Sequence, residues 1–537
     1  MVYKNGFFFR ISNQLRKFYL NSKIYDKKIS KVDIKDLSYK PSPHLLSSLI
    51  KYQKKKFKIE DFILDDVWKN KDINNKDFTT LNNFYWFFSL DLKSSKQSTQ
   101  TVVANWIKDN SKYNNKSWNF DLTAKRIIAW LSCHNLTYEE SNQNYKNNFN
   151  KIIQKQTNHL INEINKSDFI EDKLIGCASI ILVGLCYKNE KNYLSFGSSV
   201  LKKISKITLD NYGFPKSRNV KQLILFLKYY ILIREWFKES QKSIPEHVDE
   251  TIYYLGQGYA FFWRNEGSNS LFNGNNLSNN IVFDNYLKRL GYRFKNENQE
   301  LGGYIILKNK RISLIMDVGN TPSFNHTKDY QSGALSFEVV SNGKKLISNC
   351  GYYKKNSKKL NHLSRSSAAQ STLVIDDNSS CRFVETNKTL LVKKGLKIIE
   401  KDSIFEKNYW RIIASHDGYL KRYNSIHERK IEFFPEKMVF VGTDRIIRKK
   451  TNHNYKFDIR FHLEPSVKLM KTQDNKTILI ELDGEGWKFT CDNYDINIDN
   501  GLYFGNKNLY TDNQNIFISG ISNNQTENIK WELKKIQ

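Results

Sequence analysis

The stretch ALSFEVVSNGKKLISNCG, residues 334–351, decides how the second half of this 537-residue chain folds. Its apolar residues recur with a period of two, as they do when one face of a strand is buried. Between the two apolar runs stands Asn342-Gly343, a pair that favours the two-residue turns between antiparallel strands. The stretch therefore predicts a β-hairpin.

Short segments of the same kind follow one another to the C-terminus. They are rich in β-branched and aromatic residues and are separated by turn residues, which is typical of an antiparallel β-sandwich. The segments are RISLIMDVGN from residue 311, STLVIDD from 371, EKMVFVGTDRII from 436, KFDIRFHLEP from 456, KTILIELDGEGWKFTCD from 476 and QNIFISGIS from 514.

The first half of the chain, up to about residue 265, has an apolar period of three to four, which indicates antiparallel helices. WNFDLTAKRIIAWLSCHNL (118–136) is amphipathic and offers Asp121 and Thr123 as helix caps. The period changes within FFWRNEGSNSLFNGNN (261–276). We predict an N-terminal extension with the first helices over 1–95, a helical domain over 96–275 and a β-sandwich domain over 276–537.

The composition allows several partners. The net charge of +30, from 85 Lys and Arg against 55 Asp and Glu, favours an anionic partner such as nucleic acid, a membrane surface or an acidic polysaccharide. The excess of Lys, Asn and Ile is also what AT-rich coding produces. No helix-turn-helix, zinc or RNP signature accompanies the charge, so we expect no nucleic-acid partner. The six cysteines are scattered without a CxxC pair, which argues against a zinc knuckle or a disulfide framework.

The N-terminus MVYKNGFFFRISNQLRKFYL has too short an apolar run for a secretory signal peptide. No stretch approaches the ~18 apolar residues that a transmembrane helix needs. The sequence therefore predicts neither a signal peptide nor a transmembrane segment.

Nine motifs in a fixed order identify a family. They are WNFDLTAKRIIAW, GCASIILVGLCY, KSRNV, FFWRNEGSNSLFNG, GALSFEV, NCG, RSSAAQSTLVIDD, HDGYLKRYNSIHERK and FDIRFHLEP. From about residue 100 onward they resemble heparinase II/III-like proteins, especially a bacterial branch. The resemblance implies an α/α toroid followed by an antiparallel β-sandwich, in a polysaccharide lyase that acts on uronic-acid-containing glycans. It also implies a cell-envelope or periplasmic location, with the cytoplasm as the alternative because no signal peptide is predicted.

Such a lyase performs β-elimination, which needs a base at C5 of the uronate, a group that neutralises the carboxylate and an acid for the departing oxygen. The resemblance makes Asn219 a candidate carboxylate neutraliser, although it stands where it could simply cap a helix. Arg218 could bind a substrate carboxylate in a bidentate fork.

Relatives that hold zinc carry ligands at three places where this chain has Gln331, Asn349 and Gln370. A further family histidine corresponds to Asp329. Carboxamides are poor zinc ligands, so we predict no metal and no cofactor. We expect these three amides to hydrogen-bond one another, and Gln331 and Gln370 to contact substrate.

The remaining candidates lie mostly in the β half. His416 and Tyr419 are the predicted acid and base if catalysis survives, with a structural role as the alternative, while His427 and Arg365 are predicted substrate contacts. His362 and His326 could replace the lost imidazoles. His462 is expected to be a packed strand residue. Tyr254 and Tyr259 lie where more distant lyases place a catalytic tyrosine.

Two functions follow from these candidates. One is a zinc-independent lyase for an acidic glycan, and the other is an inactive protein that binds such a glycan or assembles it in the envelope. The sequence leaves open which polysaccharide it is and which oligomeric state the protein has.

Overall fold

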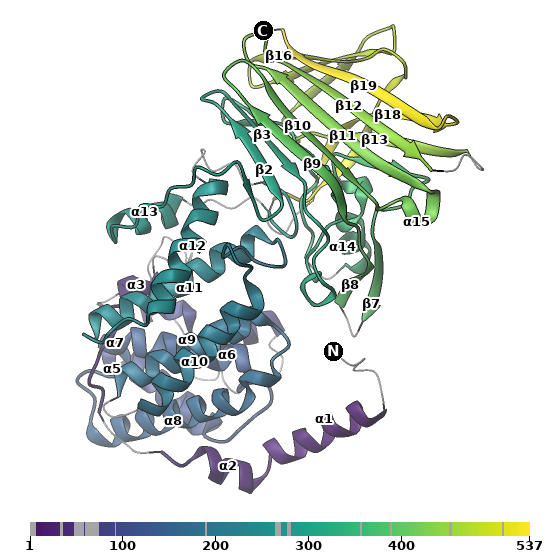
Figure 1. Cartoon of the computed structure of the whole chain (residues 1–537). Helices are drawn as coiled ribbons and strands as arrows, with labels where there is room; N and C mark the ends of the chain where they lie inside the picture. Colours follow the sequence, from purple (N-terminus) through teal and green to yellow (C-terminus); the bar gives the residue numbers. More distant parts are fainter. Residues whose placement is uncertain are drawn as a thin grey trace. The chain divides into compact units, whose positions relative to one another are not determined.

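The computed structural model forms two compact units (Figure 1). Unit 1 comprises residues 1–208, 225–253 and 281–293, and unit 2 comprises residues 209–224, 254–280 and 294–537. The contiguous domain boundaries after residues 95 and 275 stay predictions. The described residues are 7–32, 36–47, 58–59, 75–91, 93–187, 191–263, 270–276, 281–354, 357–386, 389–449, 454–506 and 510–536, so Met1–Gly6 and residues 264–269 of two quoted motifs lie outside them.

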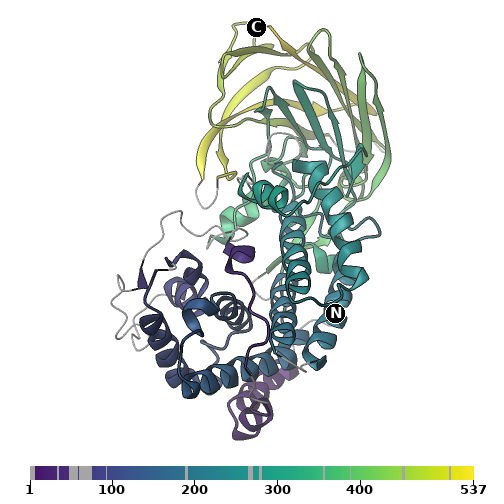
Figure 2. The ribbon, with the colours of Figure 1, turned by 90° about the vertical axis from the view of Figure 1, so that its left-hand side faces the viewer.

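The first half is helical, as predicted, and has the α/α toroid fold (Figure 2). The helix α9 is apolar on nearly all sides and is buried along most of its length. No helix among the described residues is both long and apolar enough to cross a membrane. The helices are α1 (Phe7–Leu20), α2 (Lys23–Ile29), α3 (Pro43–Ser47), α4 (Asn75–Asn83), α5 (Lys96–Asn110), α6 (Phe120–Ser132), α7 (His134–Thr137), α8 (Gln143–Glu163), α9 (Ile170–Cys186), α10 (Lys191–Thr208), α11 (Val220–Glu239), α12 (Glu246–Trp263) and α13 (Ile281–Arg289).

The start of α6 differs from the prediction. Its N-cap is Asn119, whose side chain accepts a hydrogen bond from the backbone N–H of Asp121. Asp121 and Thr123 lie inside the helix, so neither caps it. The side chain of Asn119 satisfies one of the N–H groups that a helix leaves unpaired at its start.

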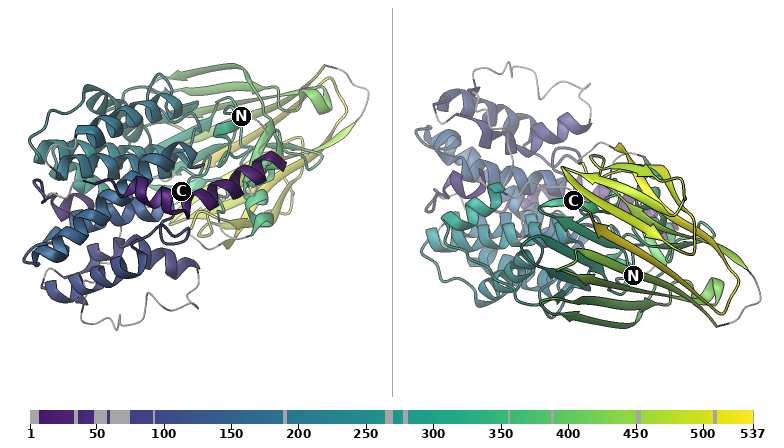
Figure 3. Two further views of the ribbon diagram at one scale, coloured as in Figure 1. Left: turned by 90° about the horizontal axis from the view of Figure 1, so that it is seen from below. Right: turned by 90° about the horizontal axis from the view of Figure 1, so that it is seen from above.

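Unit 2 contains an antiparallel β-sandwich (Figure 3). An eight-stranded sheet has the order β14-β15-β16-β19-β12-β11-β10-β9, a five-stranded sheet runs from β1 to β5, and a four-stranded sheet has the order β17-β18-β13-β6. The strands are β1 (Glu300–Leu301), β2 (Tyr304–Lys308), β3 (Ile312–Asp317), β4 (Phe337–Ser341), β5 (Lys344–Ile347), β6 (Leu373–Ile375), β7 (Arg382–Thr386), β8 (Thr389–Lys394), β9 (Ile398–Phe405), β10 (Trp410–His416), β11 (Ser425–Phe434), β12 (Val439–Arg448), β13 (Tyr455–His462), β14 (Lys468–Lys471), β15 (Thr477–Leu482), β16 (Glu485–Cys491), β17 (Ile496–Tyr503), β18 (Thr511–Ser522) and β19 (Thr526–Lys535).

The predicted hairpin is confirmed. Strands β4 and β5 pair in antiparallel fashion, and Asn342 and Gly343 between them have φ angles of 44° and 79°. Positive φ at both central residues matches the right-handed twist of the flanking strands.

Aromatic side chains fill the core between the sheets. Phe337 of β4 stacks on Trp531 of β19 with ring centroids 5.6 Å apart, and Phe461 of β13 meets Phe489 of β16 at 4.8 Å. The eight-stranded sheet therefore packs against both the five- and the four-stranded sheets. Burying each such side chain contributes about 1.5–3 kcal/mol.

Candidate functional site

Asn219, directly before α11, both caps a helix and presents an amide. Its Oδ1 accepts hydrogen bonds from the backbone N–H groups of Lys221 at 2.8 Å and Gln222 at 3.2 Å. Because the oxygen is held by the helix, Nδ2 faces the other way and lies 3.4 Å from Oδ2 of Asp329. The cap therefore fixes the direction in which the amide can donate.

Asp329 joins Asn219 to a tyrosine. The hydroxyl of Tyr352 donates a hydrogen bond of 2.8 Å to Oδ1 of Asp329. Burial tends to raise the pKa of Asp329, but Lys354, Lys328, the Tyr352 hydroxyl and Arg365 outweigh it and lower that pKa. Burial, and then the nearby Asp329 carboxylate, raise the pKa of Tyr352. At neutral pH the pair therefore consists of an ionised carboxylate and a protonated phenol.

The loop of residues 270–276 holds these groups in place. Asn276 binds the backbone of Tyr352 twice: its Oδ1 accepts from the N–H and its Nδ2 donates to the carbonyl, both at 2.8 Å. Gly274 has a φ of +86°, and a Cβ there would lie 2.7 Å from Nδ2 of Asn219 and 2.8 Å from Cβ of Asp329. Only glycine suits this position, both for its backbone angle and for the space available. We call Asn219, Asp329 and Tyr352 the candidate site, and all three lie in unit 2.

The amides of the sequence prediction bind backbone groups, so the expectation that they bond one another is wrong. Gln331 accepts from the N–H of Gly274 at 3.0 Å and donates to the carbonyls of Gly351 and Ser364. Gln370 donates to the same Ser364 carbonyl at 3.2 Å. The carboxamides satisfy buried backbone groups that would otherwise lack partners.

Asn349 behaves similarly, since its Oδ1 accepts from the N–H of Ser371 at 2.8 Å. Gln331, Gln370 and Asn349 are at most 1% exposed. The structure therefore gives Gln331 and Gln370 structural bonds in place of the expected substrate contacts.

The residues at these positions do not suit zinc. Their side-chain oxygens belong to neutral amide groups. The oxygens of Gln331 and Asn349 already accept hydrogen bonds from backbone N–H groups. Within the described ranges, no group of three or more His, Cys, Asp and Glu side chains is placed to hold a metal ion. Carboxamides bind zinc far more weakly than imidazole or carboxylate, so the donor set argues against a zinc site here.

Arg218 is committed to the protein itself, which corrects the predicted contact with a substrate carboxylate. Its guanidinium donates to Asp317 at 2.6 Å and also to the carbonyls of Gly302, Gly303 and Gly319. Its positive charge therefore already has a buried carboxylate partner, and four bonds hold the guanidinium away from solvent.

Arg365 is likewise structural. It donates to the carbonyls of Thr327 at 2.7 Å, Tyr330 at 2.8 Å and Leu390 at 2.7 Å, and it is 1% exposed. The predicted substrate contact of Arg365 is therefore replaced by a link between three chain segments.

The predicted acid and base lie in the interior of the sandwich. His416 and His427 pair across β10 and β11, with their ring nitrogens 3.3 Å apart, and His427 Nε2 lies 2.7 Å from Oδ1 of Asp444. Arg429 donates to the same oxygen at 2.8 Å. We call His416, His427, Arg429 and Asp444 the enclosed cluster, and each is at most 1% exposed.

Tyr419 lies beside this cluster. Its hydroxyl donates to the carbonyl of Leu373 at 2.8 Å, and the residue is 1% exposed. A polysaccharide cannot reach any of these side chains without opening the sandwich. The structure therefore assigns Tyr419, His416 and His427 to the core and not to a substrate surface.

The remaining candidate histidines and tyrosines differ in their burial. His462 is packed, as predicted, with Nε2 2.9 Å from the carbonyl of Ala368 and Nδ1 2.5 Å from Oδ1 of Asn515. His362 is exposed, His326 is half-buried, and Tyr259 is buried in α12, whereas Tyr254 packs on Gly213.

The sequence analysis missed Tyr352 altogether. Its one local signal is that it follows the NCG motif, whose Gly351 has a φ of +83° and turns the chain out of the sheet. Asp329 carried a clearer signal, because it occupies the position of a family histidine.

Comparisons with known proteins agree with this fold. Residues 297–532 match the family model described as heparinase II/III-like, C-terminal. The structure is similar to a crystal structure of heparinase III with a TM-score of 0.67 and 15% identity, covering 96% of this chain and 85% of that one. A second heparinase III has a TM-score of 0.69 and 14% identity, with 99% and 92% covered.

The heparan sulfate lyase HepC from Pedobacter heparinus has a TM-score of 0.63 and 14% identity to this chain, with 98% and 88% covered. At these identities the likeness concerns the fold. No curated protein sequence matches this chain.

Proposed function

Since residues 297–532 match the heparinase II/III-like, C-terminal family model, we propose that the protein cleaves a uronic-acid-containing polysaccharide by β-elimination without zinc. A base takes the proton from C5 of the uronate, a double bond forms between C4 and C5, and the bond from C4 to the glycosidic oxygen breaks. That oxygen takes a proton and leaves as a hydroxyl. The proposed place of action is the cell envelope.

The observation that carries this proposal is the chain of hydrogen bonds from Asn219 through Asp329 to Tyr352. It brings together an amide donor, a carboxylate and a phenol, the three kinds of group that the reaction uses. The Asn219 amide would donate to the uronate carboxylate as negative charge builds on it, and such a donor is worth about 10²–10³ in rate.

Asp329 and Tyr352 take the two proton-transfer roles. Asp329 would accept the C5 proton, and the Tyr352 hydroxyl would protonate the departing oxygen. The reaction then leaves a protonated Asp329 beside an ionised Tyr352. Because their oxygens are 2.8 Å apart, the proton can pass directly from the acid to the phenolate and restore both groups.

A second function, glycan binding without turnover, is favoured by the lowered pKa of Asp329. A carboxylate that loses its proton easily is a weak base, and its oxygen already lies beside the amide that a substrate carboxylate would need. Under this alternative the site recognises the polymer, and the chain has lost elimination.

The variant Asn219→Ser separates the two roles of Asn219. Serine keeps an oxygen that can cap α11 but lacks the amide donor. We expect the unfolding midpoint to change little and the turnover of a panel of acidic polysaccharides, followed by the ultraviolet absorbance of the unsaturated uronate, to fall about 10²–10³-fold. The matched control is Asn142→Ser, which changes the N-cap of α8 in the same way and should leave turnover intact.

Three results would decide the proposal. Turnover that Asn219→Ser removes supports elimination at this site. Turnover that survives the substitution contradicts the role of Asn219. Binding of a polymer with no absorbance change in the wild type supports the second function.

A further inference from the structure

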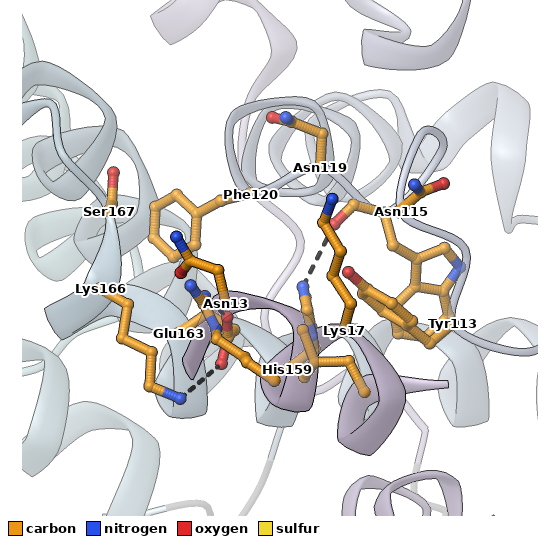
Figure 4. A pocket seen from close by; sticks show the side chains of 13 residues that line it. Asn13, Lys17, Tyr113, Asn115, Asn119, Phe120, His159, Glu163, Lys166 and Ser167 are labelled. Carbon is orange, nitrogen blue, oxygen red and sulfur yellow. Dashed lines mark hydrogen bonds and ion pairs between the residues drawn. The ribbon is translucent and has the colours of Figure 1, made fainter. Parts of the chain in front are cut away.

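Unit 1 contains a cavity of about 340 Å³ that no step of the proposed reaction uses (Figure 4). It lies between α1, the segment that leads into α6, and the end of α8. Every residue that lines it lies within 13–167 and hence in unit 1.

One wall of the cavity is aromatic. Tyr113, Trp118 and Phe120 line it, and the rings of Tyr113 and Trp118 lie 6.3 Å apart. Trp118 is fixed from behind, because its indole N–H donates to the carbonyl of Asn110 at 2.9 Å. His159 continues the wall, and burial lowers its pKa to about 3, so this ring is neutral at pH 7.

The lining also carries positive charge. Arg16, Lys17 and Lys166 line the cavity together with Glu163. The buried Glu163 pairs with both Arg16 and Lys166. Together with Lys17, the lining carries three cations and one carboxylate and so keeps an excess of two positive charges. Burial lowers the pKa of Lys166, and the nearby charge of Arg16 lowers it further.

Amides line the rest of the cavity, from Asn13, Asn115 and Asn119. The oxygen of Asn119 caps α6, which leaves its Nδ2 to donate elsewhere. In Figure 4 the labelled asparagine and lysine side chains lie around the same space as Tyr113 and Phe120. The lining thus offers ring faces, amide groups and positive charge together.

We propose that this cavity binds an acidic sugar unit of the polysaccharide, as a second attachment point in the helical unit. Ring faces pack against the C–H faces of a sugar, the amides pair with its hydroxyls, and the cations pair with its carboxylate or sulfate. A free phosphate would use the cations and leave the aromatic wall unused. The inference rests on the proposed function for its ligand class, an acidic glycan, but it uses none of the residues of the candidate site.

The test is calorimetric titration of the full chain carrying Tyr352→Phe, which should slow turnover during the titration, with a tetrasaccharide of alternating glucuronate and N-acetylglucosamine. We expect binding that Lys17→Glu with Lys166→Glu weakens at least tenfold, and that Tyr113→Leu also weakens. Lys17 and Lys166 are exposed, so their substitution should not prevent folding. The matched control is Lys27→Glu, which alters an exposed lysine of α2 outside the cavity.

Binding that the Lys17 and Lys166 substitutions leave unchanged would overturn the proposal. The proposal would also be overturned if AMP, a nucleotide with an aromatic base and a phosphate, bound more tightly than the tetrasaccharide. It would be overturned too if a neutral N-acetylglucosamine tetramer bound as tightly as the acidic tetrasaccharide. The two proposals fail separately: binding at the cavity without turnover in the wild type contradicts only elimination, and turnover with no effect of the cavity variants on binding contradicts only the cavity.

Discussion

Unit 2 holds two groups of polar side chains that differ in their access to solvent. In the candidate site, Asp329 is half-buried and meets Asn219 and Tyr352 from two other segments. In the enclosed cluster, Asp444 is fully buried and accepts from Arg429, His427 and Trp531. One carboxylate is partly exposed to solvent, and the other is surrounded by its own chain.

This difference separates two reasons for keeping polar residues. The Asp444 carboxylate balances the charge of Arg429 inside the sandwich, so its removal would leave a cation uncompensated in the core. The Asp329 carboxylate hydrogen-bonds two neutral side chains, Asn219 and Tyr352, and the charges of Lys354, Lys328 and the buried Arg365 keep it ionised. We therefore expect substitutions in the enclosed cluster to change stability and those in the candidate site to change activity.

The largest effect is expected for a matched pair of tyrosines. Tyr352→Phe removes the proposed proton donor and should lower turnover about 10²–10⁴-fold, the usual worth of general acid catalysis. Tyr419→Phe removes only a hydroxyl that donates to a backbone carbonyl, so turnover should stay near that of the wild type. Initial rates, followed by the ultraviolet absorbance of the product, measure the turnover of both variants. If Tyr419→Phe lost turnover and Tyr352→Phe kept it, the chemistry would lie beside the enclosed cluster.

The next comparison concerns stability. Asp444→Ala should lower the free energy of unfolding by about 3–5 kcal/mol, because it leaves Arg429 buried and unpaired. Asp329→Ala should cost less, about 1–3 kcal/mol, because it removes hydrogen bonds from two neutral side chains, Asn219 and Tyr352. Urea unfolding of the two variants beside the wild type measures both values, and equal losses would contradict the distinction between the two carboxylates.

The enclosed cluster should contribute to the pH dependence of stability, beside the buried His159 and His462, whose pKa values burial also lowers. Burial, with His427 and Arg429 nearby, lowers the pKa of His416 well below its ordinary value of about 6.5. Below pH 6.5 the unfolded chain binds a proton at this residue that the folded chain does not. The free energy of unfolding therefore falls as the pH decreases, by about 1.4 kcal/mol per pH unit for one such histidine.

His416→Gln should reduce this slope in unfolding experiments between pH 7 and pH 5. The exposed His362 is the matched control, and His362→Gln should leave the slope as it is in the wild type. A slope that neither substitution changes would mean that His416 does not stay neutral in the folded chain.

The strands and the hairpin could be predicted because their signals are local. The period of two marks a half-buried strand wherever it occurs, and Asn342-Gly343 specifies its turn within two residues. Asn219 could also be found, since a helix start is marked by its own sequence. The resemblance also made it a candidate carboxylate neutraliser, but its bond with Asp329 could not be predicted, because Nδ2 meets a residue 110 positions away.

The misplaced residues show what sequence alone does not contain. In the sequence, Arg218 and Arg365 look equally able to bind a substrate carboxylate. In the structure, both guanidinium groups donate to backbone carbonyls, and that of Arg218 also donates to Asp317. The HDGY motif predicted an accessible acid and base. Strands β10 and β11 pair so that the side chains of His416 and His427 lie in the core. Which way a side chain faces depends on contacts between distant segments.

The smallest effect is expected from zinc. Saturating zinc or a chelator should leave the Tm of the wild type unchanged, because Gln331 and Asn349 already use their oxygens for backbone N–H groups. If zinc did bind, a free zinc concentration of 100 times the Kd would raise the free energy of unfolding by about 2.7 kcal/mol and the Tm by several degrees. Such a rise would contradict this expectation. The triple variant Gln331→His, Asn349→Asp, Gln370→His is the positive comparison. Gln331 and Gln370 reach the same Ser364 carbonyl, so histidines there should converge and give a Tm that rises with zinc.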